Sequence, residues 1–156
     1  MRIQDNTFIK PLPTDDLLQK REQRWRVTLP EDYRNFLTKN NGGIPIEMSF
    51  ACNDHSYAVT RFLCVLENYK DSKFGWYDIG VVVSQIEERL TDNLDLIGVE
   101  VLPIAELFGG DYVCLDYRAD KHNPSVCVWS HEESGEFAPV THKVANSFSE
   151  FLTSLR

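Results

Sequence analysis

The spacing of hydrophobic positions near the N-terminus predicts two helices. Thr14 can cap the first of them, whose opening turn is acidic and therefore suits the positive end of the helix dipole. Residues 30–41 are expected to form the second, because Tyr33, Phe36 and Leu37 recur at helical spacing and would share one buried stripe. A glycine pair follows, and glycine readily takes the left-handed conformation that ends helices.

Two further helices are expected later in the chain. Between residues 79 and 90, apolar side chains fall at positions 0, 3, 4, 7 and 11, which is helical spacing. Three consecutive valines in this segment would also suit a strand, but the residues that follow them favour a helix. Near the C-terminus, Ser147 and Glu150 match a helix-capping box, and apolar residues at helical spacing follow.

The remaining segments are rich in β-branched and aromatic residues and are separated by polar turns, which predicts strands. These segments are residues 48–66, 100–107, 111–118 and 125–131, with a short edge strand near Pro139. The order of elements predicts an α+β fold. We expect a mostly antiparallel or mixed sheet of about five or six strands, flanked by N-terminal, middle and C-terminal helices. Residues 1–156 are expected to form a single domain.

The net charge of the chain indicates which kinds of partner it can bind. The chain has 16 basic and 24 acidic residues, which gives a net charge of −8. Phosphate binding needs clusters of Lys and Arg, so this balance argues against direct contact with nucleic acid or an anionic membrane. It would instead attract a basic protein. The N-terminus has no apolar signal region and no run is long enough to span a bilayer, which predicts a cytoplasmic protein.

The four cysteines are expected to be free thiols in a reducing cytosol, because none forms a CxxC pair and three lie in apolar runs. Cys52 and His55 make the best available thiol–imidazole pair, but they lack a matching second pair for zinc and lie in a polar turn. Phosphate-binding and serine-nucleophile motifs are absent. The residues therefore predict no catalytic group, no metal site and no cofactor.

Four further sequence motifs follow one another along the chain. They are "LPEDYRNFLTKNNGG" from Leu29, "VLPIAELFGGDYVCLDYR" from Val101, "PSVCVWSHE" from Pro124 and "VANSFSEFL" from Val144. Together they resemble the SUKH superfamily, named partly for yeast regulators of cell-wall assembly. The resemblance implies an α+β domain without a catalytic role. Its bacterial members are mostly immunity proteins, which neutralise toxins, often nucleases, made by the same cell.

The resemblance implies a protein partner, expected to be a basic nuclease toxin whose active site is occluded. The long disordered flanks of fungal relatives are missing, which favours the bacterial type. Two alternatives stay open: a scaffold or regulatory module without a toxin partner, and a small enzyme centred on Cys52 and His55 or on the Gly-Gly-Asp turn. Candidate partner contacts were chosen because they are acidic or aromatic and fall in predicted loops. They are Asp54, Asp71, Trp76, Tyr77, Asp78, Glu106 and Asp111.

Overall fold

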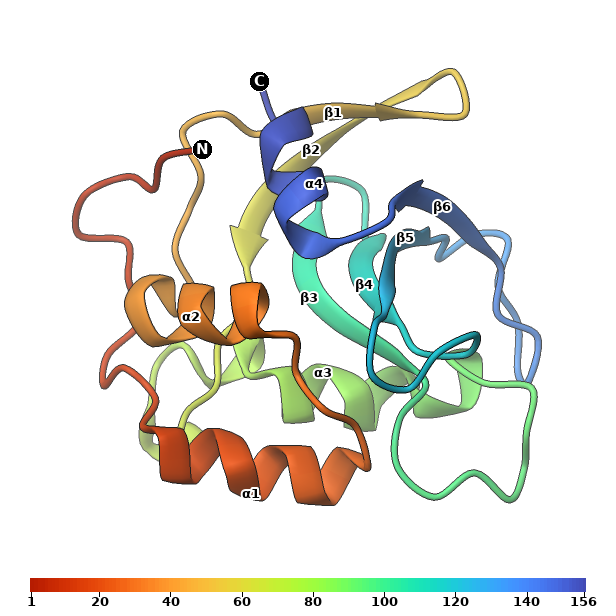
Figure 1. Cartoon of the computed structure of the whole chain (residues 1–156), viewed down its shortest axis with the longest axis horizontal. Helices are drawn as coiled ribbons and strands as arrows, with labels where there is room; N and C mark the ends of the chain where they lie inside the picture. The colour runs from red at the N-terminus through yellow and green to blue at the C-terminus, as the bar shows by residue number, and fades with distance from the viewer.

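The computed structural model describes all of residues 1–156 and has an α+β fold, with four α-helices and a six-stranded sheet (Figure 1). The strands lie side by side in chain order and every neighbouring pair is antiparallel, so of the two predicted sheet types the antiparallel one is present. Their bounds are β1 Ser49–Cys52, β2 His55–Phe62, β3 Val101–Leu107, β4 Tyr112–Asp116, β5 Ser125–Trp129 and β6 Thr141–Ala145.

The helices begin where the sequence provides capping groups. The helices are α1 Asp15–Trp25, α2 Glu31–Asn40, α3 Ile79–Ile86 and α4 Phe148–Ser154, with 3-10 turns η1 Tyr69–Asp71, η2 Gly75–Tyr77 and η3 Glu87–Arg89. The Thr14 hydroxyl accepts a bond from the backbone N–H of Leu17, and the Ser147 hydroxyl accepts one from Glu150. Both N-caps are therefore confirmed, but Glu150 does not return the bond to the Ser147 N–H that would complete the predicted capping box.

Two predicted boundaries need correction. The middle helix was expected to continue to residue 90, but α3 ends at Ile86 and its last turn tightens into η3. Such tightening is common at helix ends, where backbone groups lack partners four residues away. The edge strand was expected around Pro139, but β6 begins at Thr141 and Pro139 lies before it.

Aromatic side chains from α2 and α4 form the centre of the core. The ring centroid of Phe148 lies 4.9 Å from that of Tyr33 and 5.1 Å from that of Phe36. Phe36 in turn lies 4.7 Å from Phe62 of β2. Figure 1 shows α4 in front of the sheet, between β2 and β5. Edge-to-face packing of aromatic rings stabilises a core by more than the burial of their apolar surface alone would.

The sheet curls until its two edge strands approach each other. Sγ of Cys52, at the end of β1, lies 3.5 Å from the carbonyl oxygen of Lys143 in β6. At the other end of β1, Ser49 exchanges two backbone hydrogen bonds of 2.9 Å with Arg156. These contacts cover both ends of β1 and touch β6 at Lys143, which hinders the pairing of β1 with another chain.

Candidate functional site

The principal recess of the molecule lies between α1, α3 and the loop of residues 91–100, and we call it the α1–α3 groove. Its volume is about 720 Å³. Apolar side chains from all three elements line it, among them Trp25, Val81 and Leu94. In Figure 1 the two helices run beside each other and the loop projects past the C-terminal end of α1. The groove is therefore a feature of tertiary packing rather than of one segment.

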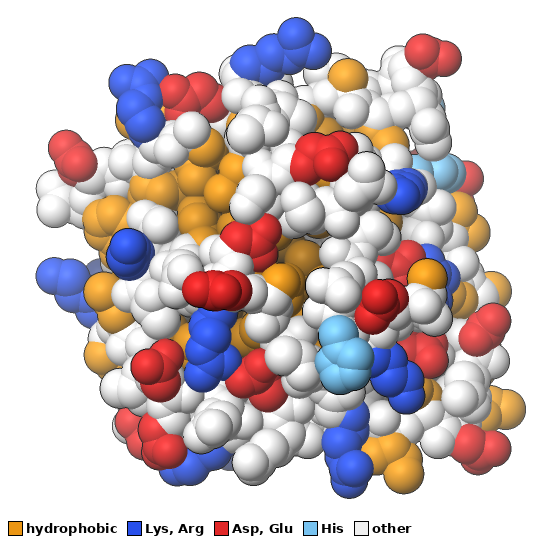
Figure 2. All heavy atoms as spheres, viewed as in Figure 1, with side chains coloured by type: hydrophobic (Ala, Val, Ile, Leu, Met, Phe, Trp, Pro, Cys, Tyr) orange, Lys and Arg blue, Asp and Glu red, His pale blue; other side chains and the backbone are white.

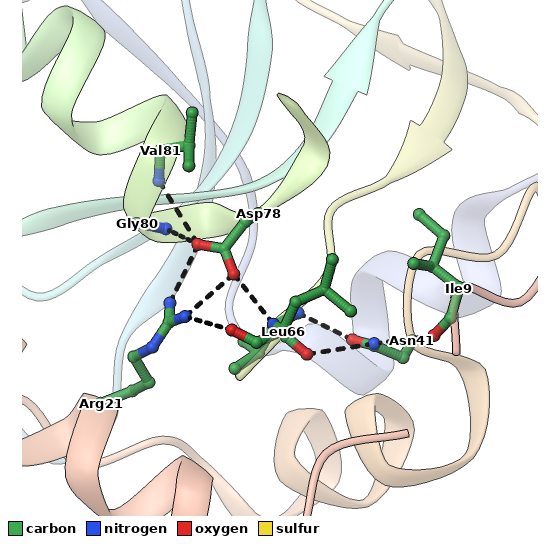
Figure 3. A network of polar contacts seen from close by, with 8 residues as sticks. Ile9, Arg21, Asn41, Leu66, Asp78, Gly80 and Val81 are labelled. Atoms are coloured by element: carbon green, nitrogen blue, oxygen red, sulfur yellow. Dashed lines mark hydrogen bonds and ion pairs between the residues drawn. The ribbon is translucent and has the colours of Figure 1, made fainter. Parts of the chain in front are cut away.

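An ion pair forms the floor of the groove. Nη1 of Arg21 donates to Oδ1 of Asp78 over 3.0 Å, and Nη2 donates to Oδ2 over 2.9 Å (Figure 3). The carboxylate also accepts bonds from the backbone N–H groups of Leu66 and Gly80. Arg21 is 6% exposed and Asp78 is fully buried. The pair thus joins α1 to the N-terminus of α3, where Asp78 is also the helix cap.

This arrangement corrects one sequence-based expectation. Asp78 was expected in an exposed loop as a partner contact, but it is completely buried and its oxygens are occupied by Arg21 and by backbone donors. A buried carboxylate with four partners has no capacity left for another protein. Asp78 is therefore a structural residue.

A second buried polar residue extends the same network. Asn41 is fully buried at the end of α2, and its amide Nδ2 donates to the carbonyl oxygens of Ile9 and Val65. Its Oδ1 accepts from the backbone N–H of Val65 over 2.8 Å (Figure 3). One side chain therefore ties the N-terminal segment and the chain after β2 to α2.

Acidic side chains surround the α1–α3 groove and none of them takes part in an ion pair. Three line the groove and two lie in its loop; they are Glu87, Glu88, Glu100, Asp92 and Asp95. The unpaired cations nearby are Arg24, which lines the groove, Arg26, whose side chain lies against Gly98, and Arg89 of η3, whose guanidinium donates to the carbonyl oxygens of His131 and Ser134. The net field at the rim is therefore negative.

The loop that forms the outer wall of the groove is held against α1. The backbone N–H of Val99 donates to the carbonyl oxygen of Trp25 over 2.8 Å. Gly98 has a φ of +93°, and a Cβ placed on it would lie 2.3 Å from that same oxygen. Only glycine fits this close approach without a shift of the backbone. The wall is consequently fixed in place by the chain itself.

Three strongly exposed apolar side chains were missed at the level of sequence. Leu94 and Ile97, in the loop of the groove, are 76% and 73% exposed, and Phe108, before the Gly-Gly turn, is 80% exposed. The sequence does carry a signal for this exposure, because each of these residues lies in a polar segment without helical or strand periodicity. An apolar residue in such a segment belongs to no helix or strand face that could bury it. Figure 2 shows a further hydrophobic gathering at the upper left of its face, where Figure 1 has the N-terminal segment.

The other expected contacts fall into two groups. Asp71, Trp76 and Tyr77 lie on η1 and η2, just before α3; Trp76 is 73% exposed, whereas Tyr77 is half-buried with the Arg61 guanidinium 5.1 Å from its ring centroid. This group lies near the α3 end of the groove, because Tyr69 of η1 lines it.

The second group lies at the sheet. Asp54 is exposed at the β1–β2 turn, with a φ of +66°, and Glu106 accepts a bond from the Thr60 hydroxyl over 2.9 Å. Asp111 follows the Gly-Gly turn, and its carboxylate accepts a bond from the backbone N–H of His131, across the sheet end. The structure therefore does not gather all seven predicted residues into one surface.

Chemistry at the cysteines is suppressed by burial. All four thiols are free and buried. Burial raises the pKa of Cys52, and it raises the pKa of Cys64 to about 12. A thiol with a raised pKa is a poor nucleophile at neutral pH, because the thiolate is the reactive form. Cys52 was expected in a polar turn beside His55, but it closes β1 and faces the carbonyl of Lys143.

No group of three or more His, Cys, Asp or Glu residues lies in an arrangement that could hold a metal ion. No helix has the length and apolar character needed to cross a membrane.

Comparison with known proteins adds to this description. The family model SUKH_6, described as SMI1-KNR4 cell-wall, matches residues 15–152. The chain belongs to the SUKH_6 family. This confirms the resemblance inferred from the four motifs. One relative is the SPbeta prophage-derived uncharacterized protein YokK of Bacillus subtilis (strain 168), which is 27% identical over 152 residues, covering 91% of this chain and 74% of the relative. No solved structure matches this chain.

Membership in SUKH_6 sets the class of function. Proteins of the SUKH group are generally non-catalytic and of the immunity type, and the group suggests a protein as the partner.

Proposed function

We propose that this SUKH_6 protein is a cytoplasmic, non-catalytic immunity protein whose single domain, residues 1–156, binds a cognate toxin. The toxin is a basic nuclease domain, and binding occludes its active site. Family membership is the observation that carries the proposal. The net charge of −8 supports it, because an acidic protein is steered towards a basic partner and would compete with the nucleic-acid substrate.

The surface offers the residue types that such a complex needs. Trp76 is the exposed aromatic anchor, and Tyr77 would contribute its accessible edge only. Asp71 beside them is exposed, and Asp54, Glu106 and Asp111 would supply charge from the sheet end. Rim charges of this kind mainly speed the encounter, whereas a buried aromatic anchor slows dissociation.

Co-expression is the direct test. A toxin-like domain encoded beside this gene should arrest growth alone and be tolerated with this chain, and a stoichiometric complex of the purified proteins should lack nuclease activity. Trp76→Ala should weaken the complex at least tenfold while leaving the thermal midpoint unchanged, since its side chain is 73% exposed. Leu12→Ala, at an apolar side chain 42% exposed, is the matched control.

A scaffold without a toxin partner would give the opposite pattern. No neighbouring domain would be toxic, or a complex would form and leave the nuclease fully active. Either result would replace the immunity proposal.

A further inference from the structure

We propose that the α1–α3 groove is the docking site for the partner and that it receives a short basic segment carrying one large apolar side chain. This rests on the proposed function and names the site and the chemistry of the segment. None of the groove's rim acids or loop residues was among the contacts expected from sequence.

The floor of the groove favours a macromolecular segment over a small polar ligand. Its buried polar groups, Arg21 and Asp78, neutralise each other, and the Asp78 oxygens already accept four bonds within 3.0 Å. A small-ligand site usually presents a few unsatisfied polar groups that fix the orientation of the ligand. The contact that remains available comes from the apolar side chains beside the floor, such as Trp25 and Val81, so the specificity must come from the rim.

Charge at the rim selects the sign of the occupant. The five unpaired acids at the groove and its loop outnumber the three arginines, Arg24, Arg26 and Arg89, and the Arg89 guanidinium is already bonded to two carbonyl oxygens. A segment with two or more Lys or Arg side chains would pair with Glu87 and Glu88 on η3 and with Glu100, which also lines the groove. An acidic segment of equal hydrophobicity would be repelled, which gives discrimination by charge.

The apolar contribution comes from a preformed wall. Leu94, which lines the groove and is 76% exposed, lies with Leu96 on a loop that Gly98 and the Val99–Trp25 hydrogen bond hold in place. Since the wall is already ordered, docking would cost little loop entropy. The lining residues run furthest along α3 and η3, from Gly80 to Glu88, which is about 13 Å of helix, so the groove suits about nine helical or four extended residues of the partner.

A pair of synthetic peptides tests this inference without the toxin. The probe is a labelled 12-residue peptide with three Lys and one Trp on a neutral polar background, and its counterpart replaces each Lys with Glu. Fluorescence anisotropy should show saturable binding of the basic peptide only, weakening as salt increases. Backbone amide shifts should move at residues 80–100 and at the C-terminal end of α1.

Two variants locate the contact. Leu94→Ser should lower affinity at least tenfold, as should Glu87→Gln with Glu88→Gln. Asp5→Asn with Glu132→Gln removes the same charge from exposed positions that do not line the groove and should change affinity less than twofold.

Three results with the peptides would overturn the inference: no binding of the basic peptide, equal binding of both peptides, or amide shifts confined to the sheet end. So would a dimer in light scattering that Leu94→Ser dissociates, because a second copy would then be the occupant.

The same variants separate this inference from the proposed function. If a cognate toxin is neutralised equally well by the groove variants, the immunity function stands and the groove is not its site. If the groove binds the basic peptide but no toxin is neutralised, the docking chemistry stands and the immunity function does not.

Discussion

Arg21 and Asp78 form a buried bidentate ion pair between residues 57 positions apart, and that pair fixes α3 against α1. Burying two charges costs several kcal/mol, and their mutual attraction offsets this cost only when the geometry is good and the remaining bonds are made. Both conditions hold here, because backbone groups of Leu66 complete the pair from both sides. The groove therefore stands on a rigid polar floor.

Removing one partner of this pair should be severe. Asp78→Asn leaves the Arg21 charge buried without a counter-ion and should lower the free energy of unfolding by about 3–5 kcal/mol. Urea denaturation measures this loss. Asp16→Asn, which breaks the exposed Asp16–Lys20 pair, is the control and should cost no more than about 1 kcal/mol. Similar costs for the two variants would show that the buried pair does not support the fold.

Gly98 and Gly109 make a matched pair for testing the close approach of the groove loop. Their φ angles are +93° and +97°, but a Cβ at Gly98 would meet Trp25, whereas one at Gly109 would meet nothing within 4 Å. Gly109→Ala should cost only the conformational strain, about 1–2 kcal/mol. Gly98→Ala should cost clearly more, because the loop must also move away from α1. Chemical denaturation of both variants compares them, and equal losses would mean that the loop yields freely.

The Asn41 side chain should be essential for the packing of α2 against the segment that follows β2. Asn41→Ala removes the partner of three backbone groups, on Ile9 and Val65, and each buried unsatisfied group costs about 1–3 kcal/mol. Hydrogen exchange at the Val65 amide should accelerate together with the loss of stability. Asn40→Ala, one residue earlier, is the control because the Asn40 side chain makes no hydrogen bond. Unchanged exchange at Val65 in the Asn41 variant would contradict this account.

Alkaline pH should destabilise the fold through its buried thiols. Burial, the main cause, raises the pKa of Cys64 from 9.0 to about 12, and it also raises those of Cys114 and Tyr33. The unfolded chain therefore loses the Cys64 proton near pH 9, while the folded chain keeps it until about pH 12. Stability is fully present below pH 9 and should fall above it, by at most about 1.4 kcal/mol per pH unit for this thiol.

Urea denaturation between pH 8 and pH 11 measures this slope. Cys64→Ala should make the slope shallower, whatever it does to stability at pH 8. A slope that is the same in the variant and the native chain would show that Cys64 titrates normally in the fold.

The sequence by itself determined most of the local structure. Thr14, Ser147 and the periodic apolar residues specified where helices begin and which face they bury, because caps and periodicity act within a few residues. The family could also be read from the order of four motifs across residues 29–152, and the match over residues 15–152 confirmed it.

Only the tertiary structure decided what the surface offers. Asp78 has the same local signals as an exposed loop acid, yet a guanidinium from another helix buries it. Leu94 and Ile97 have the composition of core residues, yet the loop that carries them is held outside the core by the bond from Val99 to Trp25. The burial of a side chain depends on which distant segments pack together in the fold. Short-range sequence patterns do not specify those long-range contacts.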